Sequence, residues 1–283
     1  MNIHVSLNQF IIIYKRERMT EDILKKIKQL PPLPESAMQI EAVYQNPEST
    51  FNDMVKILER DPLLTADILK AANSPLYGFS REINAISQAV GLFGMGTVRG
   101  FALASIVKKS FSLDLSPYGI NSDMFSLLSK KQHGVTTAWC LRKEGKLLGI
   151  LSPAAFLVEI GKVLIAQQII ADKTQQKFKD ALLSLQDVEA AEREVVGVDT
   201  PEVSATVFEH WRFESGLINV IRNCQNPDDA KDEYKKAAQI LQVVRVAVPI
   251  NGVVTEASIS KAKELIVKYG LDMESFDKAI ENA

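Results

Sequence analysis

Two charged side chains interrupt the most apolar stretch of the chain, and they mark the first place to look for chemistry. Between residues 154 and 166, only Glu159, Gly161 and Lys162 are not apolar. Glu159 and Lys162 are three residues apart, so on a helix they lie on one face and can form an ion pair. A buried carboxylate is costly unless such a donor satisfies it.

Other residue types that support catalysis are scarce, with three histidines and two cysteines in the chain. His133 and Cys140 share a helical face, but a rise of 1.5 Å per residue separates them by about 10 Å, too far to ligate one ion. A metal site of Cys224 with His133 and Glu159 is geometrically open. We favour the alternative, in which His133 is an ordinary buried histidine and Cys224 packs as a small apolar residue.

The element that positions Glu159 and Lys162 is expected to be a buried helix over residues 152–171. Ser152 is a good N-cap, and Pro153 suits the first helical turn. A helix that is apolar on all sides is either buried or membrane-spanning. This one is short and carries charges in its middle, so we interpret it as a core helix. Gly161 in its interior predicts the close approach of another helix.

Helical periodicity recurs along the rest of the chain, and no stretch alternates with period two for long enough to indicate a strand. Caps and breakers bound most segments, among them Thr50, Asp61 and Asp187 at helix starts. The sequence therefore predicts an all-α protein. Its later helices are expected at 85–93, 97–109, 122–144, 174–186, 188–196, 200–212, 214–224, 228–248, 256–269 and 273–280.

Three regions are expected. Residues 1–18 are interpreted as a loose N-terminal extension, followed by one protein unit over 19–283. Within that unit, an N-terminal helical bundle at 19–112 packs on a second bundle at 120–283. The loop between them contains Pro117 and Gly119.

The N-terminal half carries four motifs in order. They are Leu30-Pro31-Pro32-Leu33-Pro34, then Asp61-Pro62-Leu63-Leu64-Thr65, then Ala71-Ala72-Asn73-Ser74-Pro75-Leu76-Tyr77-Gly78, and finally residues 83–94 with an Ala-Val-x-Leu-x-Gly core. This arrangement resembles the HDOD family, regulatory relatives of the HD metal-dependent phosphohydrolases. The positions that carry the resemblance are Pro31, Pro32, Leu33, Pro34, Asp61, Pro62, Asn73, Ser74, Tyr77 and Gly78.

The core helix extends the resemblance to the HD superfamily, in which this helix reads roughly L-L-H-D-I-G-K and its His-Asp pair holds the metals. Here Val158 stands at the His position and Glu159 at the Asp position, while Gly161-Lys162 is kept. The resemblance implies a dismantled metal site that no longer holds a metal. Its positions, or those of a ligand pocket in its place, are His133, Val158, Glu159, Lys162, Glu192, Arg193, Thr200 and Cys224.

Composition limits the partners. A net charge of −2 and a pI near 6.0 argue against a protein held mainly by nucleic-acid phosphates. Two isolated cysteines indicate a reducing cytoplasm. The apolar run at 10–14 is too short for a signal-peptide core or a spanning helix, so no membrane contact is expected.

We therefore predict a non-catalytic, cytoplasmic bacterial HDOD protein of signal transduction or regulation, which binds protein partners and needs no cofactor. That role is what the resemblance implies. Two alternatives stay open. One is a divergent metal-dependent phosphohydrolase of the HD superfamily, and the other is a sensor that binds a small ligand, such as a nucleotide, in the vestigial pocket.

Overall fold

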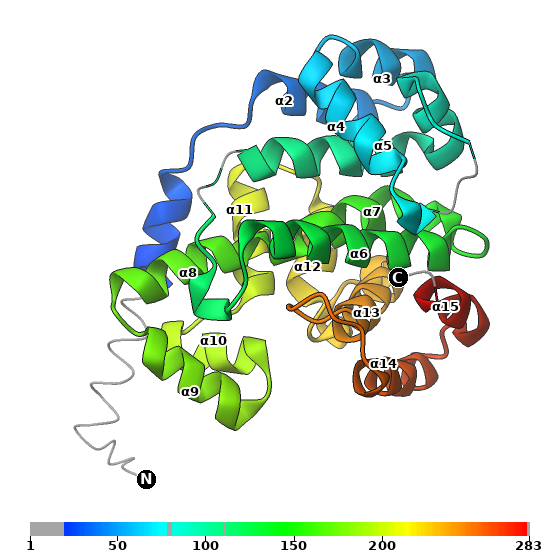
Figure 1. The fold of residues 1–283 in the computed structure, drawn as a ribbon. Helices are drawn as coiled ribbons and strands as arrows, with labels where there is room; N and C mark the ends of the chain where they lie inside the picture. Colours follow the sequence, from blue (N-terminus) through cyan, green and yellow to red (C-terminus); the bar gives the residue numbers. More distant parts are fainter. Residues whose placement is uncertain (1–19, 78–80, 110, 112, 282–283) are drawn as a thin grey trace.

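The computed structural model describes residues 20–77, 81–109, 111 and 113–281, and every regular element in that part of the chain is a helix (Figure 1). No strand occurs there, so the all-α prediction is confirmed. The expected extension at 1–18 and the motif residue Gly78 lie outside the described residues. The division into 19–112 and 120–283 stays a prediction.

Helical residues 20–28 come first. The α-helices that follow are α2 (Glu35–Gln45), α3 (Phe51–Leu58), α4 (Pro62–Ala72), α5 (Ile86–Lys109), α6 (Ser122–Cys140), α7 (Leu148–Leu157), α8 (Gly161–Ala171), α9 (Gln175–Leu185), α10 (Val188–Val196), α11 (Thr200–His210), α12 (Ser215–Asn223), α13 (Asp232–Ala247), α14 (Glu256–Tyr269) and α15 (Met273–Ile280). Short 3-10 turns are η1 (Pro75–Tyr77), η2 (Ser116–Tyr118), η3 (Gly145–Leu147), η4 (Val158–Ile160) and η5 (Pro227–Asp229).

Local capping explains where many of these helices begin. Thr50 caps α3 in a reciprocal capping box with Asp53. The Asp61 carboxylate accepts hydrogen bonds from the amides of Leu63 and Leu64, with Pro62 at the first helical position of α4. Asp187 caps α10 in the same way. These starts were predictable because each cap depends on residues close in sequence.

The helix α5 bends sharply at Gly94, whose φ of 79° and ψ of 160° are not helical. A turn between two helices was expected here, and it is confirmed. The second half of α5 packs along α7, and α6 lies beside α7 through the middle of the molecule, as Figure 1 shows. The helices α2–α4 cover α5 on one side, while α12 and α13 pack on α7 and α11 packs on α8 and α12.

The predicted start of the core helix was wrong. Ser152 is not an N-cap, because α7 begins at Leu148 and Pro153 lies inside it. A proline in a helix interior leaves the carbonyl four residues earlier without its amide donor. That carbonyl belongs to Gly149, and the guanidinium of Arg99 donates to it at 3.3 Å. A donor distant in sequence therefore lets the helix continue through the proline.

Other helix limits differ by a few residues. The helix α6 ends at Cys140 rather than Glu144, and α13 begins at Asp232 after the η5 turn.

Most of the apolar surface of the two long apolar stretches is inside the protein. The segments Ile86–Val107 and Gly145–Ala171 are long and apolar enough to cross a membrane by composition alone. However, 56% and 89% of their most apolar windows are buried against other helices, as core helices are. They belong to one continuous hydrophobic core.

Candidate functional site

The core helix breaks at the turn that carries Glu159. The turn η4 separates α7 from α8, and the Ser204 hydroxyl spans the break. This hydroxyl donates to the Val158 carbonyl at 2.6 Å and accepts from the Gly161 amide at 2.8 Å. A Cβ on Gly161 would lie 2.6 Å from the Thr200 carbonyl oxygen, so the predicted close approach of another helix is confirmed.

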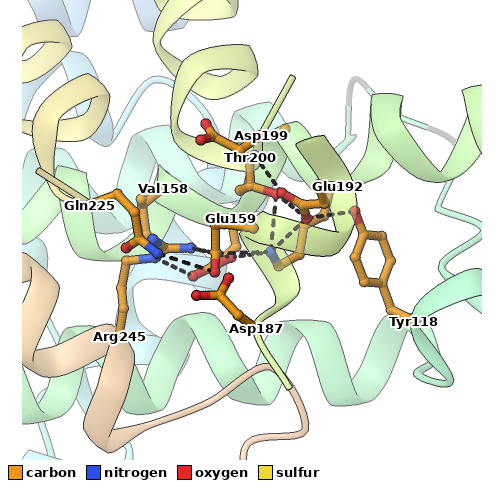
Figure 2. Close-up of polar contacts among 12 residues, drawn as sticks. Tyr118, Val158, Glu159, Asp187, Glu192, Asp199, Thr200, Gln225 and Arg245 are labelled. Carbon is orange, nitrogen blue, oxygen red and sulfur yellow. Dashed lines mark hydrogen bonds and ion pairs between the residues drawn. The ribbon is translucent and has the colours of Figure 1, made fainter. Parts of the chain in front are cut away.

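Glu159 lies buried at the centre of a group of donors (Figure 2). Its carboxylate accepts from Arg245 Nε at 2.8 Å and Nη2 at 3.4 Å, and from Gln132 Nε2 at 3.2 Å. Lys162 Nζ lies 3.2 Å away, so the predicted ion pair is confirmed. Burial opposes ionisation, but Arg245 and then Lys162 together hold the pKa of Glu159 well below its usual range.

Glu192 of α10 lies on the other side of Lys162. It accepts from the Thr200 amide at 2.6 Å, the Thr200 hydroxyl at 2.7 Å, the Tyr118 hydroxyl at 2.8 Å and Lys162 Nζ at 3.1 Å. Burial raises the pKa of Glu192, Lys162 opposes that rise, and the charge of Glu189 adds to it. The Tyr118 and Thr200 contacts to Glu192 are visible in Figure 2.

Glu189, one turn earlier in α10, completes the group. Its Oε1 accepts from Arg245 Nη2 at 2.5 Å and lies 3.6 Å from Lys162 Nζ. Its Oε2 accepts from Gln225 at 3.5 Å. Burial opposes ionisation of Glu189, but Arg245 and Lys162 lower its pKa below the ordinary value.

Together these residues form a buried ion network of three carboxylates and two cations from four elements: η4, α8, α10 and α13. Every carboxylate oxygen in it accepts at least one hydrogen bond or ion pair from inside the protein. The three carboxylates raise the pKa of Lys162 against the opposing effect of burial. A network satisfied in this way stabilises its own charges and leaves no carboxylate free as a general base.

The residues present do not fit the divalent metal that the resemblance would place here. Val158 offers no ligand atom in its side chain, and the metal-ligand position at Glu159 is occupied by the Arg245 guanidinium. Burial raises the pKa of Cys224 to about 12, so its sulfur is a thiol that accepts from Arg245 Nη1 at 3.6 Å. Within the described ranges, no three His, Cys, Asp or Glu side chains are placed to hold a metal ion.

His133 is not part of the network, which corrects the metal site of His133, Glu159 and Cys224 that the sequence left open. Its Nε2 lies 2.7 Å from the Ser152 hydroxyl, its Nδ1 bonds the Tyr77 hydroxyl, and its ring stacks on Phe156 with centroids 3.9 Å apart. Burial lowers the pKa of His133 to about 3, so the ring is neutral. The neighbouring residue Gln132 contacts Glu159 instead, because adjacent helical residues point in different directions.

Arg193 also lies outside the network. Its guanidinium pairs with Asp199 at 2.5 Å, and 47% of its side chain is exposed. The structure brings the other expected positions together: Val158, Glu159, Lys162, Glu192, Thr200 and Cys224.

Three of the described motif residues in the N-terminal half make packing or hydrogen-bond contacts. The Pro31 carbonyl accepts from the Trp211 indole at 3.0 Å, and Leu33 is buried. The Asn73 side chain donates to the Ile83 carbonyl at 2.8 Å and accepts from the Ile83 amide at 2.8 Å, closing the segment between them. These contacts give Pro31, Leu33 and Asn73 a role in holding the N-terminal helices in place.

The sequence interpretation missed Arg245, Glu189, Gln132 and Tyr118. A signal existed for Arg245, which stands in the apolar run Val243-Val244-Arg245-Val246-Ala247. A lone charge in an apolar run was the signal that singled out Glu159. The other three lie on ordinary mixed faces, and only the fold brings them to the network.

A second buried guanidinium was also missed. Arg99 binds both oxygens of Glu41, at 2.6 and 2.8 Å, and Glu214 at 2.7 Å. It lies over the ring of Tyr44, 4.2 Å from the centroid. This cluster joins α2, α5, α7 and the residue that precedes α12.

Sequence comparison agrees with this architecture. The family model described as HDOD domain matches residues 30–227. The chain belongs to the HDOD domain family. Tyr118, Lys162 and Thr200 of the network fall inside the matched range, whereas Arg245 lies beyond it.

Individual relatives are distant. An uncharacterized protein of Treponema pallidum is 24% identical in an alignment of 233 positions, which covers 77% of this chain and 42% of that protein. A protein from Shewanella amazonensis named as a candidate phosphohydrolase has 24% identity and a TM-score of 0.70, with 92% and 93% of the two chains covered. One from Marinobacter aquaeolei named as a candidate signal transduction protein has 20% identity and a TM-score of 0.67, with 95% and 63% covered. The chain thus spans under half of the curated relative, and the two structures share its fold.

Proposed function

We propose that this HDOD protein is a non-catalytic regulator in the cytoplasm that acts by binding other proteins. The observation that carries the proposal is the Arg245 guanidinium against Glu159. Glu159 stands where the resemblance places a metal-binding aspartate, and a permanent protein cation now neutralises it. A guanidinium is always charged and cannot activate a water molecule as a divalent ion does.

The state of the remaining groups supports the same proposal. Hydrolysis by HD-type enzymes requires a metal-activated water and a group that accepts its proton. The network carboxylates are occupied by donors, and His133 is held neutral in an aromatic pocket away from them. The vestigial site is equally unsuited to a nucleotide, since its cations are already neutralised by buried carboxylates.

Metal content and hydrolysis test the proposal directly. The protein as purified is expected to contain no stoichiometric iron, manganese or zinc by elemental analysis. It is also expected not to hydrolyse bis(4-nitrophenyl) phosphate when Mn²⁺ is added. Stoichiometric metal, together with hydrolysis that disappears in Glu159→Gln, would instead establish a divergent phosphohydrolase.

Partner binding is tested by affinity purification from the native cell with quantitative mass spectrometry. The expected partner is recovered with the wild type and equally with folded Glu159→Gln, because the network is buried and regulation works through the surface. A partner lost only in Glu159→Gln would place recognition in the network and contradict the proposal.

A further inference from the structure

A cavity of about 400 Å³ lies between the N-terminal helices α4 and α5 and the helices α6 and α7. Its buried walls are apolar and largely aromatic: Phe101, Phe125, Phe156, Leu157 and Ile160. A concave, mostly apolar space of this size with a few polar groups is typical of a small-molecule site. It is separate from the ion network, whose space is filled by its own side chains.

The polar residues of the cavity lie at its exposed side. Lys70 is exposed, and Lys130 and Ser126 are half-buried. Asp67 is the one carboxylate among the described lining residues, and it accepts from the Ser105 hydroxyl at 2.5 Å. Two lysines and one carboxylate are thus among the described lining residues, and this balance of charge favours an anionic group at the opening.

We propose that this cavity binds an amphipathic carboxylate, with its hydrocarbon chain against the aromatic walls and its carboxylate near Lys70 and Lys130. Burial of the hydrocarbon chain supplies most of the affinity, because each methylene group removed from water contributes favourably. The lysines select the sign of the head group. This inference goes beyond the regulatory role and does not depend on it.

The position of the cavity gives the ligand a route to the rest of the protein. Leu157 and Ile160 line it, and between them in the chain stands Glu159 of the ion network. A ligand that contacts these two side chains therefore contacts the turn η4. Ligand binding is then linked, through the same cavity walls, to the packing of α4 on α5 and of α5 on α7.

The test compares two probes with the same chain and opposite heads, dodecanoate and dodecyltrimethylammonium, both below their micelle-forming concentrations. Isothermal titration calorimetry on the full-length wild type should show saturable binding of dodecanoate and clearly weaker binding of the cationic probe. Dodecanoate should also raise the melting temperature, because a ligand specific to the folded state stabilises it.

Variants locate the site. Ser126→Trp fills the opening and should abolish dodecanoate binding, and circular dichroism checks that the variant is folded. Lys70→Ala should weaken dodecanoate binding about two- to fivefold, as expected for an exposed charge pair. The matched control Lys177→Ala, on the exposed face of α9, should not change it.

Three outcomes would overturn the proposal. The first is no saturable binding of dodecanoate by the wild type. The second is equal binding of both probes, which would remove the role of the lysines. The third is undiminished binding in folded Ser126→Trp, which would place the probe on another surface. None of these results bears on metal content or hydrolysis, so the proposed function is tested separately.

Discussion

The carboxylate of Glu159 stays ionised in the protein interior because two cations and an amide surround it. Replacing it with Gln keeps the shape and one acceptor oxygen but leaves Arg245 and Lys162 with less negative charge. We expect Glu159→Gln to lower the free energy of unfolding by about 2 kcal/mol, since a buried charged hydrogen bond is lost. Urea unfolding measures this effect, with exposed Glu264→Gln as the control that should be near neutral.

A comparison of the wild type with Glu159→Gln also distinguishes a regulator from a sensor of a small ligand. In a thermal-shift screen of nucleotides and metal ions, neither the wild type nor Glu159→Gln is expected to be stabilised. A ligand that stabilises only the wild type would show that the vestigial site recognises a small molecule.

His133 gives the protein a specific dependence on pH. Its pKa in the folded protein is about 3, against an ordinary value near 6.5. As pH falls below 6.5, the unfolded chain therefore binds a proton that the folded protein excludes, and stability is lost by up to about 1.4 kcal/mol per pH unit. Urea unfolding between pH 6.5 and 5 should show this loss, and His133→Gln should show a shallower slope. Parallel slopes for both proteins would contradict the prediction.

At the scale of residues, the sequence predicted contacts that lie within one helical turn. Glu159 and Lys162 were expected to pair because their spacing alone places them on one face. Arg245 is 86 positions from Glu159, and no local pattern specifies that contact. His133 was expected at the vestigial site but lies outside the ion network. Residues one position apart on a helix face different neighbours, so the sequence did not show which of them would reach Glu159.

At the scale of elements, the break between α7 and α8 depends on a tight contact with α11. Gly161→Ala would place a Cβ against backbone atoms of α11, including the Thr200 oxygen at 2.6 Å. Backbone in a packed core yields little, so we expect a loss of about 3 kcal/mol in unfolding free energy. Gly145→Ala is the matched control, because nothing lies within 4 Å of its added Cβ. A fall in melting temperature equal to that of the control would show that α11 moves away freely.

The element boundaries show which part of a helix a sequence specifies. The start of α4 at Asp61-Pro62 was predicted because its donors and acceptors are adjacent in the chain. The start of α7 was placed at Ser152-Pro153, since a proline usually marks a first turn. Its true start at Leu148 depends on Arg99, which supplies a donor to Gly149 from another helix. A helix start predicted from neighbouring residues is wrong where a side chain distant in sequence replaces a backbone hydrogen bond.

At the scale of the whole molecule, Arg99 ties the N-terminal helices to α7 and to the residue before α12. Arg99→Met should cost about 3–5 kcal/mol, because Glu41 keeps its charge and loses both bonds. Removing both partners in Arg99→Met with Glu41→Met should recover much of that loss. Urea unfolding of the single and double variants measures the coupling.

The half-buried Arg222, which pairs with Glu202 and Glu209 at the surface, provides the control for Arg99. Arg222→Met should cost about 1 kcal/mol or less. Equal losses of unfolding free energy in Arg99→Met and Arg222→Met would show that the buried Arg99 cluster stabilises the protein no more than a surface ion pair does.

Under the proposed function, in which the site holds no metal, the guanidinium of Arg245 also makes that state hard to reverse. Restoring the ligand pair by Val158→His and Glu159→Asp would return two ligands, yet an arriving dication would still meet a fixed positive charge beside them. Removing Arg245 alone would leave Glu159 and Glu189 short of a counter-charge. Neither single step is favourable, so building a metal site at this position would require both changes at once.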